Sequence, residues 1–112
     1  MTVRELITTL SAEVLVEGDL DRAVTGGYCG DLLSWVMGRA KAGDVWFSVM
    51  GNVNAVAVCV LADVACLVLC ENAALDDAAR ARAELEDVTI LRSAGTAYTL
   101  SGKLASLLER TV

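Results

Sequence analysis

Histidine and proline are both absent from this chain of 112 residues, and aromatic residues make up only 4% of it. Without histidine, no Ser-His-Asp triad, Cys-His pair or histidine metal site can form. No Cys-x-x-Cys pair is present, so nothing indicates a zinc ribbon or a thioredoxin-type redox pair. We therefore predict no catalytic residues, no metal and no cofactor, and a protein that is not an enzyme.

Basic residues are also few, since 9 Lys and Arg against 15 Asp and Glu leave a net charge of −6. This charge repels phosphate backbones, so nucleic acid is not an expected partner. The most apolar stretch, residues 55–70, contains a charge at Asp63 and is shorter than the ~20 apolar residues of a membrane span. We expect no membrane contact, a cytoplasmic location, and buried, unreactive thiols at Cys59, Cys66 and Cys70.

Apolar residues, by contrast, make up 55% of the chain, most of them aliphatic. Disorder is excluded, because this much apolar surface offsets the entropy cost of ordering the chain. The length fits one domain over residues 1–112. Apolar spacing, caps and turn residues predict helices at 3–10, 32–42, 55–61, 75–87 and 97–108, and strands at 12–17, 45–50, 64–70 and 88–91.

Within these elements, several local features are expected. Thr2 caps the first helix, Ser93 or Thr96 the last, and Gly43 stops the second in a left-handed conformation. The helix over 75–87 buries Ala74, Ala78, Ala81 and Leu85, and Asp76 pairs with Arg80.

Strands that alternate with helices over short connections predict a three-layer α/β/α fold with a mostly parallel sheet. Ligands of such sheets bind beyond the carboxyl ends of the strands. Small and amide side chains follow the expected strands at these ends. The candidate ligand contacts there are Gly51, Asn52, Asn54, Ser93 and Thr96.

The segment from Asp21 to Asp31 is rich in glycine and is the best candidate for a functional loop. Its glycines allow the backbone to adopt positive φ and to approach another group closely, and Asp31 is placed to cap the following helix. If Gly26 or Gly27 adopts positive φ, Val at that position is strained. The segment matches neither the Gly-x-Gly-x-x-Gly fingerprint nor a P-loop. The loop is therefore either a ligand contact, or a tight turn held by Asp21 and Arg22. The candidate contacts are Thr25, Gly26, Gly27, Tyr28, Gly30 and Asp31.

The same segment, Asp-Arg-Ala-Val-Thr-Gly-Gly-Tyr-Cys-Gly-Asp-Leu-Leu-Ser over residues 21–34, resembles the signature of the DRTGG domain. The resemblance extends over nearly the whole chain and implies a fold similar to the N-terminal domain of HPr kinase. It implies a regulatory or ligand-sensing role. Two departures stand out: the core motif is longer here by two residues, and Asn52 stands where many relatives carry a histidine. A role for that histidine cannot be carried over.

Two functions remain open at this stage. One is a ligand-sensing module that binds an anionic metabolite or adenine nucleotide at the glycine-rich loop. The other is a structural module without a small-molecule ligand, either a homo-oligomer or an adaptor on a partner enzyme. Because so many apolar residues exceed what a small domain hides, we predict a symmetric homodimer through the helices that carry Trp35 and Leu107–Leu108.

Overall fold

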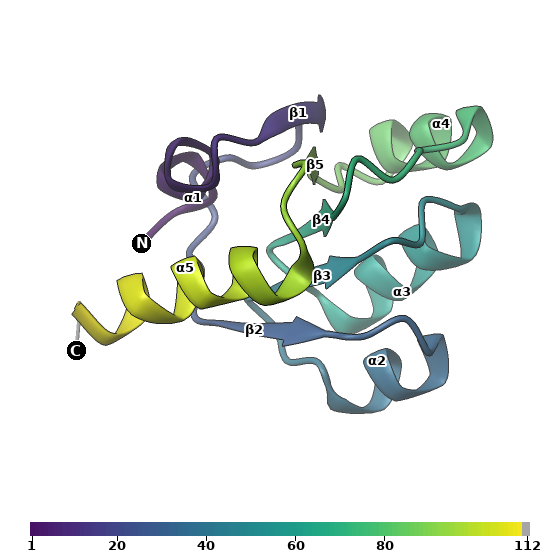
Figure 1. The fold of residues 1–112 in the computed structure, drawn as a ribbon. Coiled ribbons are helices and arrows are strands. Elements are labelled where there is room, and N and C mark those ends of the chain that lie inside the picture. Colours follow the sequence, from purple (N-terminus) through teal and green to yellow (C-terminus); the bar gives the residue numbers. More distant parts are fainter. Residues whose placement is uncertain (111–112) are drawn as a thin grey trace.

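A five-stranded sheet organises the chain, and the computed structural model describes residues 1–110 of it. The sheet order is β1-β5-β4-β3-β2, and every neighbouring pair is parallel except β1, which runs antiparallel to β5 (Figure 1). The predicted α/β fold with a mostly parallel sheet is confirmed. The strands are β1 (Glu13–Val16), β2 (Gly26–Cys29), β3 (Asp44–Ser48), β4 (Cys66–Leu69) and β5 (Ile90–Arg92).

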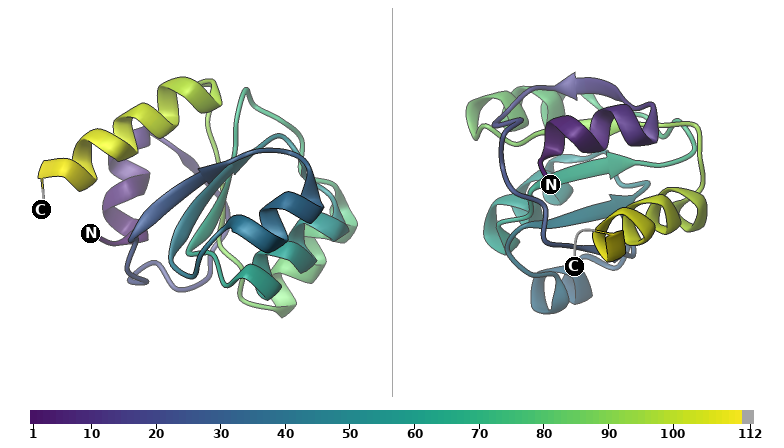
Figure 2. Two further views of the ribbon diagram at one scale, coloured as in Figure 1. Left: turned by 90° about the horizontal axis from the view of Figure 1, so that it is seen from below. Right: turned by 90° about the vertical axis from the view of Figure 1, so that its left-hand side faces the viewer.

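Five helices cover the two faces of this sheet, which gives the three layers seen in Figure 2. One face carries α1 (Val3–Leu10) and α5 (Ala97–Arg110). The opposite face carries α2 (Leu33–Arg39), α3 (Val53–Ala62) and α4 (Asp77–Leu85). In the part of the chain that the structure describes, no helix is long and apolar enough to cross a membrane.

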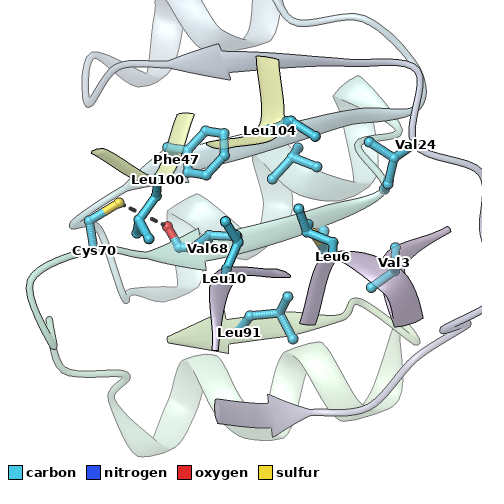
Figure 3. Close-up of a cluster of buried hydrophobic side chains, with 13 residues drawn as sticks. Val3, Leu6, Leu10, Val24, Phe47, Val68, Cys70, Leu91, Leu100 and Leu104 are labelled. Atoms are coloured by element: carbon cyan, nitrogen blue, oxygen red, sulfur yellow. Dashed lines mark hydrogen bonds between the residues drawn. The ribbon is translucent and has the colours of Figure 1, made fainter. Parts of the chain in front are cut away.

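The core under α1 and α5 follows directly from the apolar spacing of the sequence. Thr2 caps α1 as expected, since its hydroxyl oxygen accepts from the Glu5 amide at 3.3 Å. The residues at helical spacing on α1 are buried against the sheet and against α5 (Figure 3). This cluster includes Leu6, Leu10, Phe47, Val68, Leu91, Leu100 and Leu104.

The core on the other face is built around Trp46, which is fully buried and donates from its indole nitrogen to the Gly30 carbonyl at 2.8 Å. Here the predicted apolar face of α4 is wrong. Ala79 and Ala83 are the buried residues of α4, whereas Leu85 is 79% exposed. Ala79 and Ala83 have the same helical spacing as the predicted residues. The apolar spacing of the sequence therefore could not show which of the two faces of α4 is buried.

Two further local expectations are wrong, the Asp76–Arg80 ion pair and the end of the second helix, and the expectation for Gly43 holds in part. Asp76 accepts from the Ala79 amide at 2.7 Å as the N-cap of α4, and Arg80 donates to the Leu15 carbonyl at 2.6 Å, so the two form no ion pair. The second helix, α2, ends at Arg39 rather than near residue 42. Gly43 does adopt positive φ (85°), but in the turn that leads into β3.

Asp21 and Arg22 do fix the connection before β2, although not by pairing with each other. Arg22 donates to both the carboxylate and the carbonyl of Asp63, each at 3.0 Å. Asp63 itself ends α3 in the left-handed conformation, with φ of 54°. Asp21 accepts from Arg4 at 3.2 Å. The segment is thereby held against two helices at the amino edge of the sheet.

Candidate functional site

The glycine-rich segment is a strand rather than a loop. Residues Gly26–Cys29 form β2, paired in parallel register with Asp44–Phe47 of β3. Among the described glycines, only Gly43 has positive φ, so Gly26 and Gly27 do not meet the condition under which Val would be strained by φ. Both positions are instead crowded. A Cβ on Gly26 would lie 2.7 Å from the Asp44 carboxylate oxygen, and one on Gly27 would lie 3.1 Å from the Leu104 side chain.

Asp31, the expected cap of the second helix, has another function. Its Oδ1 accepts from the Ser48 hydroxyl at 2.6 Å and from the Val49 amide at 3.1 Å. The residue at the N-cap of α2 is Leu32, which makes no side-chain cap bond. Asp31 therefore joins the chain after β2 to the end of β3.

The candidate residues after β3 and after β5 both lie at the carboxyl edge of the sheet, but most of their polar side chains are engaged in holding loops. Asn52 accepts from the Ala55 amide at 2.9 Å and so caps α3. Thr96 accepts from the Thr99 amide at 3.2 Å in the same way at the start of α5. Ser93 accepts from the Gly95 amide at 3.4 Å, and Asn54 is exposed.

Gly51 allows two of these loops to come together. A Cβ on Gly51 would clash with the carbonyl oxygen of Ala74, and the Gly51 carbonyl accepts from the Asp76 amide at 2.9 Å. The loop after β4 is tied in turn to the loop after β5, because Glu71 and Asn72 donate to the Gly95 and Ser93 carbonyls. Hydrogen bonds thus join these carboxyl-edge loops to one another.

The remaining candidates lie elsewhere. Thr25 and Gly26 stand at the start of β2, and Thr25 donates to the Ala42 carbonyl at the amino edge of the sheet. Tyr28 is half-buried on the face of α2 to α4, beside Gly30. The eleven predicted residues therefore occupy two edges of the sheet and the strand between them, rather than one site.

A cavity of about 570 Å³ lies between β2 and α5, and sequence reasoning missed most of it. Its strand side is formed by Gly27 and Cys29 of β2 and by Phe47 of β3. Because Gly27 has no side chain, Leu104 of α5 approaches the strand closely at one side of this cavity. The α5 side is formed by Tyr98, Thr99, Ser101, Gly102, Leu104, Ala105 and Leu108.

Of the predicted contacts, Gly27 alone lines this cavity. If residues 26–29 are taken as a strand, Gly27 and Cys29 point to the same face of the sheet, because side chains alternate along a strand. This alternation is the sequence signal that could have indicated the strand side of the cavity. A neighbouring hollow shares Thr99 and Gly102 with the cavity and adds Lys103 and Thr9.

The cysteines have two kinds of surroundings. Cys59, Cys66 and Cys70 are buried as predicted, and burial raises the pKa of Cys59 to about 12 and that of Cys70 to about 11. Burial raises the pKa of Cys66 as well. All three thiols stay protonated at neutral pH and are poor nucleophiles. Cys29 is exposed at the cavity.

No protein family and no curated protein matches this sequence. Among solved structures, the chain is similar to the CBS and DRTGG domains of the regulatory region of Clostridium perfringens pyrophosphatase, complexed with its activator diadenosine tetraphosphate. The TM-score is 0.70 at 12% identity, over 92% of this chain and 45% of that one. The chain thus spans less than half the length of this regulatory region. At this identity the likeness shows the fold alone.

Proposed function

We propose that this chain is a regulatory module that senses a small molecule and performs no chemistry of its own. The similar structure belongs to a regulatory region and was complexed with a nucleotide activator, which supports a sensing role. The observation that carries the proposal is the cavity between β2 and α5. Its volume of about 570 Å³ falls within the ~300–1,000 Å³ of small-molecule sites.

The lining favours a flat ring with a few polar groups, as in an adenine nucleotide. The exposed ring of Tyr98 provides aromatic surface, and the hydroxyls of Thr99 and Ser101 provide hydrogen-bonding groups. Lys103 in the adjoining hollow supplies a cation for a phosphate group. This site moves the proposed ligand from a glycine loop to the face of the glycine-containing strand.

Titration calorimetry with adenosine, AMP, ATP and diadenosine tetraphosphate tests this proposal. We expect saturable binding of at least one nucleotide to the native chain and a loss of tenfold or more in Ala105→Phe, which fills the cavity from α5. Ala81→Phe is the matched control, because Ala81 is exposed on α4 and lies outside the cavity. Lys103→Gln is expected to weaken the binding of the nucleotides, which carry phosphate groups, and to leave the binding of adenosine unchanged. Absence of heat for all four ligands at millimolar concentration contradicts the proposal.

A second candidate function is an interaction module that docks onto a second copy or a partner enzyme without a small ligand. The observation that favours it is the set of large apolar side chains in contact with solvent on α2. Leu32 at its N-cap is 58% exposed, Trp35 is 51% exposed and Met37 is 48% exposed. Trp35 is stacked beneath the guanidinium of Arg39, 3.6 Å from the ring centre. Light scattering at micromolar concentration separates a homodimer from a monomer that awaits a partner.

A further inference from the structure

The two edges of the sheet, β1 and β2, differ in how their backbones are protected. An edge strand exposes unpaired N–H and C=O groups, and proteins usually block such edges with charges, bulges or covering groups. An edge without these features is available for pairing with another strand.

The β1 edge carries three of these features. A register shift between Val14 and Val16 bends the strand. Glu13 places a charge on it and pairs with Arg92 at 3.1 Å. Arg80 of α4 donates to the Leu15 carbonyl at 2.6 Å and so occupies a backbone acceptor of this strand. Another chain cannot add to β1 without displacing these groups.

The β2 edge carries none of them. Its sequence, Gly26-Gly27-Tyr28-Cys29, has no charge and no proline. Its register with β3 is unbroken. Over residues 1–110, no side chain forms a hydrogen bond with the backbone of these four residues. The outer side of β2 is therefore an unblocked, uncharged edge.

The helices on the two faces of the sheet beside this edge carry exposed apolar side chains. The left view of Figure 2 looks at β2 from below, with α5 on one side of the strand and α2 on the other. Tyr98 at the start of α5 is 89% exposed, and Trp35 of α2 is 51% exposed. Since burying an aromatic side chain removes about 150–250 Å², these two rings offer on the order of 250 Å² per copy.

This area is about half of what a dimer needs. A stable interface buries at least about 1,000 Å² in total, or about 500 Å² per copy. Leu32, Met37 and the strand itself add to the two rings. An uncharged strand also suits a two-fold axis, because no like charges meet there although each copy carries a net charge of −6.

We propose that β2 pairs antiparallel with β2 of a second copy of this chain, which joins the two sheets into one continuous ten-stranded sheet. The pairing satisfies the free backbone groups of both strands and covers the apolar side chains beside them. This inference specifies the surface for the self-association candidate above, and it does not depend on binding of a nucleotide.

Cross-linking of the native chain gives the first test, because Cys29 lies on β2 and is the exposed cysteine, whereas Cys59, Cys66 and Cys70 are buried. At about 3.3 Å per residue, the two Cys29 thiols lie within about 20 Å of each other for an axis anywhere within the strand. A bis-maleimide of that length is expected to give covalent dimer from the native chain and none from Cys29→Ser. Native chain that stays uncross-linked contradicts the pairing.

Molar mass by light scattering gives the second test. Cys29→Lys places a charge on β2, and Val14→Lys places the same charge on the exposed surface of β1 as the matched control. We expect twice 11.8 kDa for the native chain and for Val14→Lys, and 11.8 kDa for Cys29→Lys with unchanged circular dichroism. A monomeric native chain overturns the inference. A dimer that persists in Cys29→Lys and is not cross-linked shows self-association through another surface, and also overturns it.

Discussion

The link between Asp31 and Ser48 makes a quantitative prediction, because the structure assigns Asp31 to the end of β3 instead of to the cap of α2. The Asp31 carboxylate accepts from the Ser48 hydroxyl at 2.6 Å and from the Val49 amide at 3.1 Å. Ser48 is buried, 3% exposed, whereas Asp31 is exposed. A hydrogen bond to a charged group contributes about 1.5–3 kcal/mol to the free energy of unfolding. Because the carboxylate is exposed to water, each of the two bonds to Asp31 contributes an amount at or below the lower end of this range.

We therefore expect Asp31→Ala to lower the free energy of unfolding by about 2 kcal/mol. Ser48→Ala removes the shorter bond to Asp31 and also the bond that the Met50 amide donates to Ser48 Oγ at 3.1 Å, so it is expected to cost about 1–2 kcal/mol. In a double-mutant cycle, the two substitutions should show a coupling energy of about 1 kcal/mol, because they share the bond between Asp31 and Ser48.

Urea denaturation followed by circular dichroism measures all four members of this cycle. A helix cap at Asp31 would give a different result, since the cap bond would not involve Ser48. Additive effects of Asp31→Ala and Ser48→Ala, with a coupling energy of zero, would refute the assignment.

Two further predictions concern packing and pH. Gly51→Ala should destabilise the fold by about 1–3 kcal/mol or more, because the added Cβ meets the Ala74 carbonyl, whereas Gly38→Ala, with nothing within 4 Å, should be stabilising by about 0.5–1 kcal/mol; equal melting temperatures for both variants would contradict this. The raised pKa of Cys59, about 12 against 9.0 when unperturbed, means that the unfolded chain loses this proton first. Its contribution to stability is complete below pH 9 and is lost as pH rises toward 12. The stability difference between the native chain and Cys59→Ala should thus be constant to pH 8 and shrink above pH 9, and a difference independent of pH up to 11 would contradict it.

Elements with strong periodic patterns could be predicted from the sequence. The helix at Val3–Leu10 appears with the predicted bounds and cap. The continuously apolar strand at Cys66–Leu69 lies in the middle of the sheet, where both of its faces are covered. In these segments, local pattern and tertiary burial favour the same conformation.

The glycine-rich strand could not be predicted in the same way. Gly26 and Gly27 have low strand propensity. The contacts that require glycine at these two positions cannot be recognised from the neighbouring sequence. Those contacts are with Asp44, next in register on β3, and with Leu104, far along the chain on α5. Glycine is found both where another group approaches the backbone closely and where the backbone has positive φ, so its presence alone does not distinguish the two.

The cavity depended on that same missed strand. Its walls come from three segments, around residues 27–29, 47 and 98–108. Their meeting is a result of sheet order, since α5 returns across the sheet to cover β2 and β3. The prediction for Asp31 was wrong for a related reason. The start of the second helix is close to Asp31 in the sequence, whereas its actual partner, Ser48, is 17 residues away.

The central claim is that a small molecule, such as an adenine nucleotide, binds between β2 and α5. Amide chemical-shift perturbation during titration of the native chain with AMP and diadenosine tetraphosphate tests it most directly. We predict saturable shifts concentrated at Gly27, Cys29 and residues 98–108. Absence of shifts at millimolar nucleotide, or shifts confined to the carboxyl-edge loops around Asp31, Asn52 and Ser93, would contradict the claim.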